Sequence, residues 1–331
     1  MMIRRNHRCH RLAAALMCLM LTVTACRSDH TATRADNLTA IRIALYPSAS
    51  TLPVRAAIAQ GMFERNGLHI DVTEGQDLPL FMASLAKGQY DVAMSGPTLV
   101  LIGAEKGLDL QIVSSLQQSS RDRPNAVWIT RDPSITTVAQ LKSKTIAVPS
   151  LTGIITDSLV YLLMRDGVPR DEVKFVQAPF AAMGDQLAAG KVDAAVASIP
   201  FSAAILSRGF HAHDDVIVEA VRAASGGTVD TAMTSVWAAS GPYARAHPDA
   251  IRAFRRSISE AVDFLDADAT EARAMMRDWL KMPAPVVERS TLPEWGADVT
   301  VAEMAPYVTI AKAVGSVRGD PDVTALVWQG T

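Results

Sequence analysis

Cysteine is scarce in this chain, and its placement excludes several kinds of chemistry. The 331 residues include only three cysteines, Cys9, Cys18 and Cys26, all close to the N-terminus. The sequence beyond Cys26 therefore has no disulfide, no thiolate nucleophile and no cysteine-ligated metal site. A body of about 300 residues does not need disulfides, because it can bury a large apolar core.

Blocks of basic residues are also missing. Lys and Arg total 32 against 34 Asp and Glu, which gives a formal net charge of −2 at pH 7. Four of the arginines lie in the first 25 residues, which contain no acid, so the rest of the chain is more acidic than the whole. No segment interleaves aromatic and basic residues, and we therefore expect no nucleic-acid partner.

A short sequence motif occurs twice in the rest of the chain. Its copies are residues 85–95 and 187–198. In each copy a helical segment ends at a glycine, as suits a left-handed helix cap, and a short apolar run that predicts a buried strand follows. Asp91 and Asp193 stand between the two parts, where we expect them to order their turns through hydrogen bonds to the backbone.

The repeat extends backward along the chain. Residues 43–48 resemble residues 146–150, and both segments read as a strand that ends in Pro-Ser. Each copy then alternates strands and helices, which predicts an α/β fold with two similar lobes. Chance similarity between two Ala- and Gly-rich segments is the alternative interpretation.

The N-terminus has the features of an export signal. Four arginines precede an apolar run over residues 12–23, which is too short for a comfortable membrane span. Val23-Thr-Ala-Cys26 resembles the bacterial lipobox, which implies that Cys26 is lipidated. We predict a lipoprotein signal peptide over residues 1–25 and a tether over residues 26–38. A plain secretory signal or a single N-terminal anchor is the alternative.

Two extended runs suggest where the chain passes between lobes. Residues 126–130 and 234–239 each place Val next to Trp, and we interpret them as the two crossings. Residues 39–128 with 236–331 would form the first lobe, and residues 129–235 the second. Within the second lobe, the β-branched run 216–218 predicts a strand.

The order of these elements resembles the periplasmic solute-binding proteins of ABC transporters, in their two-crossing (type II) form. The branch that binds nitrate, sulfonate, taurine and thiamine precursors is the most similar. The residues that carry the resemblance are 59–68, 85–93, 141–148 with Gly153, 187–194 and 248–254. It implies mixed sheets flanked by helices, two lobes that close on a ligand, and no cofactor, metal or catalytic residue.

The resemblance also implies partners and a location. A small-molecule ligand would bind in the cleft between the lobes, and the permease subunits of an ABC importer would receive it. The protein would be a monomer, exported and held at the bacterial membrane by the lipid on Cys26.

Ligands of open α/β sheets bind at the carboxyl ends of strands, and in this sequence those ends carry hydroxyls and helix starts instead of Arg or Lys. We therefore expect a small organic anion or polar heterocycle, held by backbone N–H groups, hydroxyls and aromatic rings. Simple helix capping is the alternative role for the hydroxyls. The predicted ligand-binding residues are Tyr46, Ser48, Ser50, Gln76, Asp77, Ser95, Gly96, Thr98, Ser150, Thr152, Gly153, Phe180, Ser198 and Trp237.

Two other functions fit the same fold. Related thiamine-pyrimidine synthases are enzymes, but no Ser-His-Asp set or phosphate-binding glycine loop appears in this sequence. His211 and His213, beside two aspartates in a predicted loop, resemble a metal site but lack a third ligand. A sensor lipoprotein that signals to a membrane receptor is an alternative to an importer component, and a binder of a pyrimidine or thiamine precursor is an alternative to a sulfonate-, taurine- or nitrate-like binder.

Overall fold

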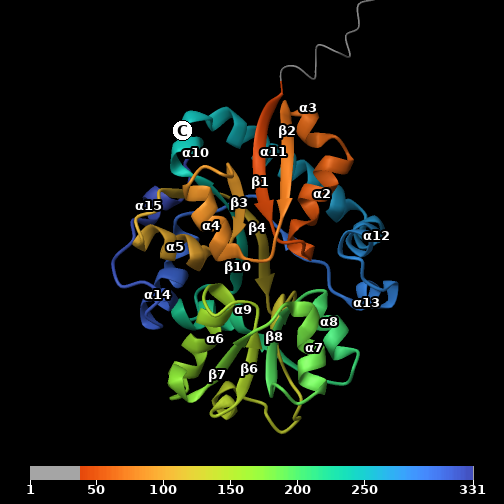
Figure 1. Cartoon of the computed structure of the whole chain (residues 1–331), viewed down its shortest axis with the longest axis vertical. Coiled ribbons are helices and arrows are strands. Elements are labelled where there is room, and N and C mark those ends of the chain that lie inside the picture. The colour runs from red at the N-terminus through yellow and green to blue at the C-terminus, as the bar shows by residue number, and fades with distance from the viewer. Residues whose placement is uncertain (1–37, 331) are drawn as a thin grey trace, which may run out of the picture. The chain divides into compact units, whose positions relative to one another are not determined.

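Two separate β-sheets, each flanked by helices, make up the computed structural model, which describes residues 38–330 (Figure 1). Residues Thr39–Thr331 form one compact unit. The predicted signal peptide, the predicted lipidation site Cys26 and the predicted tether up to residue 37 lie outside the described residues. None of the described helices is both long and apolar enough to cross a membrane.

The first sheet has six strands in the order β11-β4-β10-β3-β1-β2. Strand β1 pairs in parallel with β2 and β3, whereas β10 runs antiparallel to β3 and β4. The apolar side chains of Ile41, Ile43 and Leu45 anchor β1 in the core, where they are fully buried. The strands are β1 (Thr39–Leu45), β2 (Leu68–Glu74), β3 (Val92–Ser95), β4 (Leu110–Ser120), β10 (Thr231–Ser240) and β11 (Glu294–Trp295).

The second sheet has five strands in the order β7-β6-β8-β5-β9. Strand β6 pairs in parallel with β7 and β8, and β5 runs antiparallel to β8 and β9. The strands are β5 (Ala126–Thr130), β6 (Thr145–Val148), β7 (Lys174–Gln177), β8 (Ala194–Ser198) and β9 (His211–Asp215). Both sheets are thus mixed, and each joins a parallel βαβ core to antiparallel strands.

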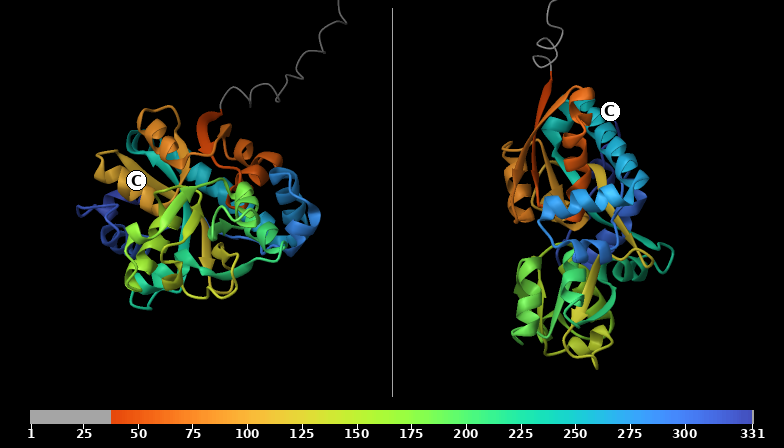
Figure 2. Two further views of the ribbon diagram at one scale, coloured as in Figure 1. Left: turned by 60° about the horizontal axis from the view of Figure 1, so that its bottom comes forward. Right: turned by 90° about the vertical axis from the view of Figure 1, so that its right-hand side faces the viewer.

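Helices cover both faces of each sheet. On the first sheet, α2, α3 and α11 share one apolar core, while α4, α5 and α14 lie on the opposite side (Figures 1 and 2). On the second sheet, α6 and α9 belong to one apolar cluster and α7 and α8 to another. The α-helices are α2 (Leu52–Ala59), α3 (Met62–Arg65), α4 (Leu78–Ala86), α5 (Pro97–Glu105), α6 (Ile154–Arg165), α7 (Phe180–Ala188), α8 (Phe201–Leu206), α9 (Val216–Ala224), α10 (Gly241–Ala246), α11 (Pro248–Ala267), α12 (Ala269–Leu280), α13 (Ala284–Arg289), α14 (Ala305–Ala313) and α15 (Val323–Leu326). Short 3₁₀ helices are η1 (Ala49–Thr51), η2 (Val138–Leu141), η3 (Arg170–Glu172) and η4 (Ala302–Met304).

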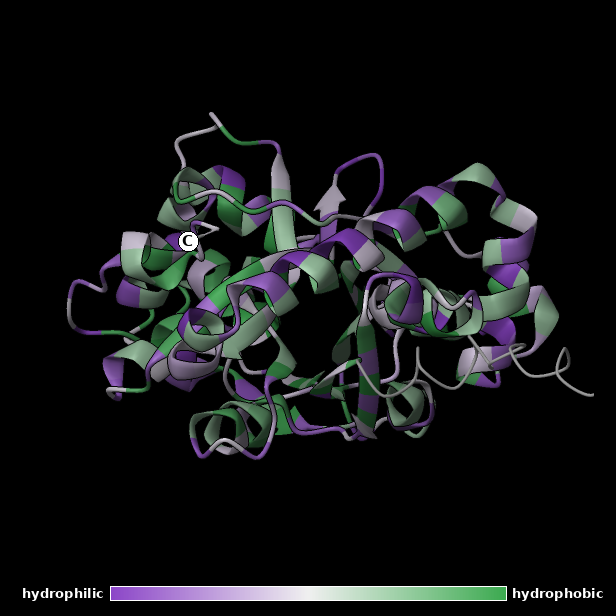
Figure 3. Ribbon diagram, turned by 90° about the horizontal axis from the view of Figure 1, so that it is seen from above, coloured by the Kyte–Doolittle hydropathy of each residue, from purple (hydrophilic) through white to green (hydrophobic). Residues whose placement is uncertain are grey.

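The longest helix, α11, follows directly from its apolar spacing. Ile251, Phe254, Ile258 and Leu265 recur at intervals of three, four and seven residues and are fully buried. The Phe254 ring stacks on Phe63 with centroids 5.9 Å apart, which fixes α11 against α3. The hydropathy colouring shows hydrophilic and hydrophobic segments alternating along the helices, as this one-sided burial requires (Figure 3).

The repeated aspartates make the same contact in both sheets. The Asp91 Oδ2 atom accepts a hydrogen bond from the Arg42 backbone N–H at 2.8 Å, and Asp193 Oδ2 accepts one from the Thr145 N–H at 2.9 Å. The side-chain-to-backbone bonds expected from the sequence are therefore present. They reach the first strand of each repeat, so each aspartate joins its turn to β1 or to β6.

The chain changes sheets at different residues from those expected. The whole of β5 pairs with β8 in the second sheet, and β10 pairs with β4 in the first from Thr231 to Ser240, with Thr234 bulged out. The changes of sheet therefore fall in residues 121–125 and 225–230, ahead of the two predicted crossing segments. The predicted lobe limits remain predictions, since they concern which parts move together.

One aspartate, Asp215, joins the connection at residues 121–125 to both sheets through hydrogen bonds. The buried Asp215 Oδ2 atom accepts hydrogen bonds from the Asn125 and Ala126 N–H groups and from the Ser119 hydroxyl, at 2.7, 3.0 and 2.6 Å. Its Oδ1 atom caps α9 by accepting from the N–H groups of Ile217 and Val218.

The structure corrects two sequence predictions in this region. The run 216–218, predicted as a strand, is the first turn of α9, because Asp215 begins a helix there. His211 and His213 lie in β9, and the predicted loop is wrong.

Candidate functional site

A cavity of about 300 Å³ lies between residues of the first sheet and residues of the second. Twelve of the fourteen predicted ligand-binding residues line it, and their contact with a ligand remains a prediction. They are Tyr46, Ser48, Ser50, Gln76, Asp77, Ser95, Gly96, Ser150, Thr152, Gly153, Phe180 and Ser198.

Strand ends bring these residues together. Tyr46 follows β1, Ser95 ends β3, Ser150 follows β6 and Ser198 ends β8, so parallel strands of both sheets point their carboxyl ends at the cavity. Helices α4, α5, α6 and α7 begin beside the same space. The first N–H groups of a helix have no partner inside it, so these starts bring hydrogen-bond donors to the cavity wall.

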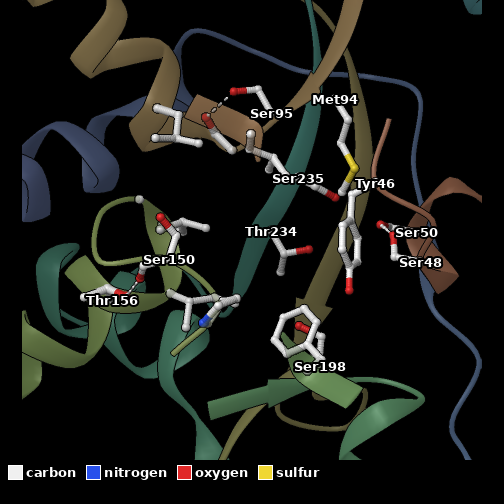
Figure 4. A pocket seen from close by; sticks show the side chains of 18 of the residues that line it. Tyr46, Ser48, Ser50, Met94, Ser95, Ser150, Thr156, Ser198, Thr234 and Ser235 are labelled. Carbon is white, nitrogen blue, oxygen red and sulfur yellow. Dashed lines mark hydrogen bonds between the residues drawn. The ribbon is translucent and has the colours of Figure 1, made fainter. Parts of the chain in front are cut away.

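Aromatic rings form one wall. The Tyr46 ring contacts Phe180 edge to face, with centroids 6.2 Å apart, and Phe180 stacks on Phe201 at 5.7 Å. The Tyr46 hydroxyl is directed toward the side of the cavity that holds Ser198 (Figure 4). Burial raises the pKa of the Tyr46 phenol, which therefore stays neutral and can donate a hydrogen bond.

Two predicted residues do not line the cavity. Trp237 is fully buried in the core of the first sheet, where its ring meets Phe254 edge to face at 5.6 Å. Thr98 is also fully buried, one residue inside the start of α5. Pattern alone could not show that these two side chains turn away from the strand ends.

Six polar residues that the sequence analysis missed also line the cavity, namely Thr156 and Gln177 on α6 and β7 and four others on or next to β4, β5 and β10. Gln117 lies on β4, Asn125 precedes β5, and Thr234 and Ser235 lie on β10. All four are buried. For Thr234 and Ser235 the available signal was a pair of polar residues inside the largely apolar β10, because burial of such a group needs a partner.

The cavity wall carries little charge. Among the described residues that line it, only Asp77 and Tyr46 are ionisable, and none is Lys, Arg or His. Asp77 Oδ1 accepts the Leu80 N–H at 3.0 Å and so caps α4. No group of three or more His, Cys, Asp or Glu residues within 38–330 is placed to hold a metal ion.

A buried carboxyl stands just behind this wall. Asp157, in the first turn of α6, is 2% exposed, and its Oδ2 atom has no hydrogen-bond partner among the described residues. Burial raises the pKa of Asp157 to about 6, and the Ser316 hydroxyl and the charge of Arg170 offset only part of that rise. The folded protein therefore binds this proton more tightly than the unfolded chain does.

The raised pKa makes stability depend on pH. The ionised carboxylate destabilises the fold fully above pH 6, and this penalty disappears as the pH falls toward the pKa of the unfolded chain. Asp157→Asn cannot ionise, so we expect it to raise the free energy of unfolding by about 2 kcal/mol at pH 7 and by almost nothing near pH 4. Urea unfolding at both pH values measures this. Asp166 is exposed at the other end of α6, so Asp166→Asn is the control. An equal change in the free energy of unfolding for both variants would contradict a raised pKa at Asp157.

Comparison with known proteins adds a family and a fold. A family model described as NMT1/THI5 like matches residues 48–272, more than half of the chain. No curated protein sequence is similar enough to match the chain. The solved structures that match share the fold at low sequence identity.

Three of these structures are informative. The periplasmic aliphatic sulphonate binding protein SsuA from Escherichia coli is 19% identical, with a TM-score of 0.70 over 88% of this chain and 97% of its own. The alkanesulfonate-binding protein SsuA from Xanthomonas axonopodis pv. citri, bound to MOPS, is 18% identical, with a TM-score of 0.72 over 87% and 98%. The periplasmic nitrate-binding protein NrtA from Synechocystis PCC 6803 is 13% identical, with a TM-score of 0.71 over 87% and 84%. The predicted fold class, α/β with two mixed sheets flanked by helices, is thereby confirmed.

Proposed function

Because the chain belongs to the NMT1/THI5-like family, we propose that it is the extracytoplasmic solute-binding component of an ABC importer. The observation that carries the proposal is the cavity at the facing strand ends of two sheets, lined by hydroxyl, amide and aromatic side chains. A small polar organic molecule fits its volume of about 300 Å³. The relatives named above bind sulfonates or nitrate, which supports a binding role over a catalytic one.

The proposed mechanism is capture by closure. Residues 121–125 and 225–230 connect the two sheets, and a bend there would bring the two walls of the cavity onto a ligand. The closed form would be the one that a permease recognises. Lipidation of Cys26 would hold the monomer at the membrane surface outside the cytoplasm, within reach of that permease.

Equilibrium binding tests this function. We expect at least one member of a panel of alkanesulfonates, taurine, nitrate, aromatic carboxylates and pyrimidines to raise the melting temperature of the full-length protein. At a hundredfold excess over its dissociation constant, such a ligand stabilises the fold by about 2.7 kcal/mol, or roughly 5 °C for a chain of this size. The absence of any shift across the panel would count against the proposal.

Uptake of the identified ligand then separates an importer from a sensor. A strain without this gene should lose uptake if the protein serves a permease. Normal uptake would favour the alternative, a lipoprotein that reports its ligand to a membrane receptor.

A further inference from the structure

Three polar residues at the cavity, Gln117, Asn125 and Ser235, make no side-chain hydrogen bond to any described residue. In that order, they are 3%, 7% and 6% exposed. Of their side-chain polar atoms, only Ser235 Oγ is itself fully buried, and the amides of Gln117 and Asn125 line the cavity, so whatever occupies the cavity is the natural partner for all three.

A bulge in strand β10 presents one of these groups, Ser235, to the cavity. Strand β10 has a bulge, because Met233 faces Gln118 and Ser235 faces Gln117, which leaves Thr234 without a partner residue on β4. Thr234 donates its hydroxyl proton to the Gln117 carbonyl oxygen at 3.2 Å. The bulge breaks the usual alternation of faces, so that Thr234 and Ser235 both line the cavity (Figure 4).

The backbone around Asn125 is fixed while its side chain stays free. The Asn125 N–H donates to Asp215 Oδ2 at 2.7 Å and to Ser119 Oγ at 3.0 Å, and its carbonyl accepts from the Ile199 N–H at 3.2 Å. The main chain is therefore held on both sides, and the amide is left for another partner.

We propose that Gln117, Asn125 and Ser235 bind the polar end of the ligand, and that this end is a neutral carboxamide or urea group. The inference rests on the proposed binding function. Each side-chain amide offers both a donor NH₂ and an acceptor oxygen, and a carboxamide or urea offers the same pair in return. An ionised sulfonate or nitrate only accepts hydrogen bonds, so it would leave the oxygens of both Gln117 and Asn125 unpaired.

The charged side chains of the cavity wall agree with a neutral head group. None of the described lining residues is Lys, Arg or His, so no side chain there would neutralise an anion, and the Asp77 carboxylate would repel one. Met94, Leu99 and Ile154 supply apolar surface for the remainder of the ligand.

Matched probes test the head group on the full-length protein. Nicotinamide, nicotinate and pyridine-3-sulfonate share one ring, and butyramide, butyrate and propane-1-sulfonate provide an aliphatic series. At about 10 mM, we expect the amide of at least one series to raise the melting temperature by about 2 °C or more, and its ionised counterparts to leave it unchanged. A larger shift with an ionised member would overturn the inference and leave the binding function standing.

Side-chain replacements then locate the contact. Gln117→Met keeps the length of the side chain but removes its amide, and we expect it to weaken binding of the amide probe about tenfold. Gln118→Met, on the adjacent β4 residue that does not line the cavity, is the matched control and should bind as the wild type does. Ser235→Ala is a milder second variant, to be used if Gln117→Met proves unstable. We expect it to weaken binding of the amide probe about threefold.

Two further outcomes would count against the inference. Full affinity in both Gln117→Met and Ser235→Ala would overturn it, and so would the absence of any shift with either amide. The broader function fails only if the wider panel of solutes also produces no binding.

Discussion

Asp215→Ala is expected to lower the free energy of unfolding by about 4 kcal/mol, the largest stability loss that we predict for a single side chain. The carboxylate accepts hydrogen bonds from the Ser119 hydroxyl and from backbone N–H groups at the start of β5 and of α9. Asp215 is only 3% exposed. Removal of its side chain would leave these donors buried without a partner, because little water reaches them.

The neighbouring aspartate provides the control. Asp214 is exposed and makes no side-chain hydrogen bond among the described residues, so Asp214→Ala should change the free energy of unfolding by less than about 0.5 kcal/mol. Urea unfolding of the two variants and the wild type measures both effects. Similar losses in both would mean that Asp215 does not join the connection at residues 121–125 to α9 as described.

Thr152→Trp should abolish ligand binding while leaving the fold intact. Thr152 is exposed in the loop before α6, yet it lines the cavity, so an indole there would occupy space that the ligand needs. We expect affinity for any ligand found in the screen to fall by about a hundredfold or more, since the indole would have to leave the site for the ligand to enter. Isothermal titration calorimetry measures the loss.

Leu151, the residue before Thr152, tests whether any bulky side chain in this loop weakens ligand binding. Leu151 is 42% exposed and is not among the residues that line the cavity. Leu151→Trp should therefore bind ligand as the wild type does. Unchanged affinity in Thr152→Trp would show that the ligand binds elsewhere on the protein.

The repeat in the sequence carried most of what could be predicted. It located the ends of β3 and β8 correctly, and therefore placed Ser95 and Ser198 at one cavity. Strand ends are readable because an apolar run stops at a turn residue. Asp91 and Asp193 were predictable for the same reason, since a turn acid beside a buried strand usually binds backbone N–H groups.

The residues that were missed depend on register, which has no local signal. Gln117 and Ser235 reach the cavity because of irregular pairing between β4 and β10, and the pairing of two distant strands cannot be read from either strand alone. Trp237 was assigned to the site as an aromatic ring in the segment predicted to cross between the lobes, but it falls on the face of β10 that packs against α11. The run 216–218 was misread because β-branched residues also occur in buried helices, where a cap such as Asp215 decides the outcome.

The weak charge of the cavity wall also affects how fast and under which conditions the ligand binds. Without Lys, Arg or His among the described lining residues, the site exerts little long-range attraction on an approaching molecule. Association should then proceed at an ordinary diffusional rate and depend only slightly on ionic strength. At the proposed location outside the cytoplasm, where salt varies with the surroundings, the proposed recognition through hydrogen-bond direction and shape would keep nearly constant affinity.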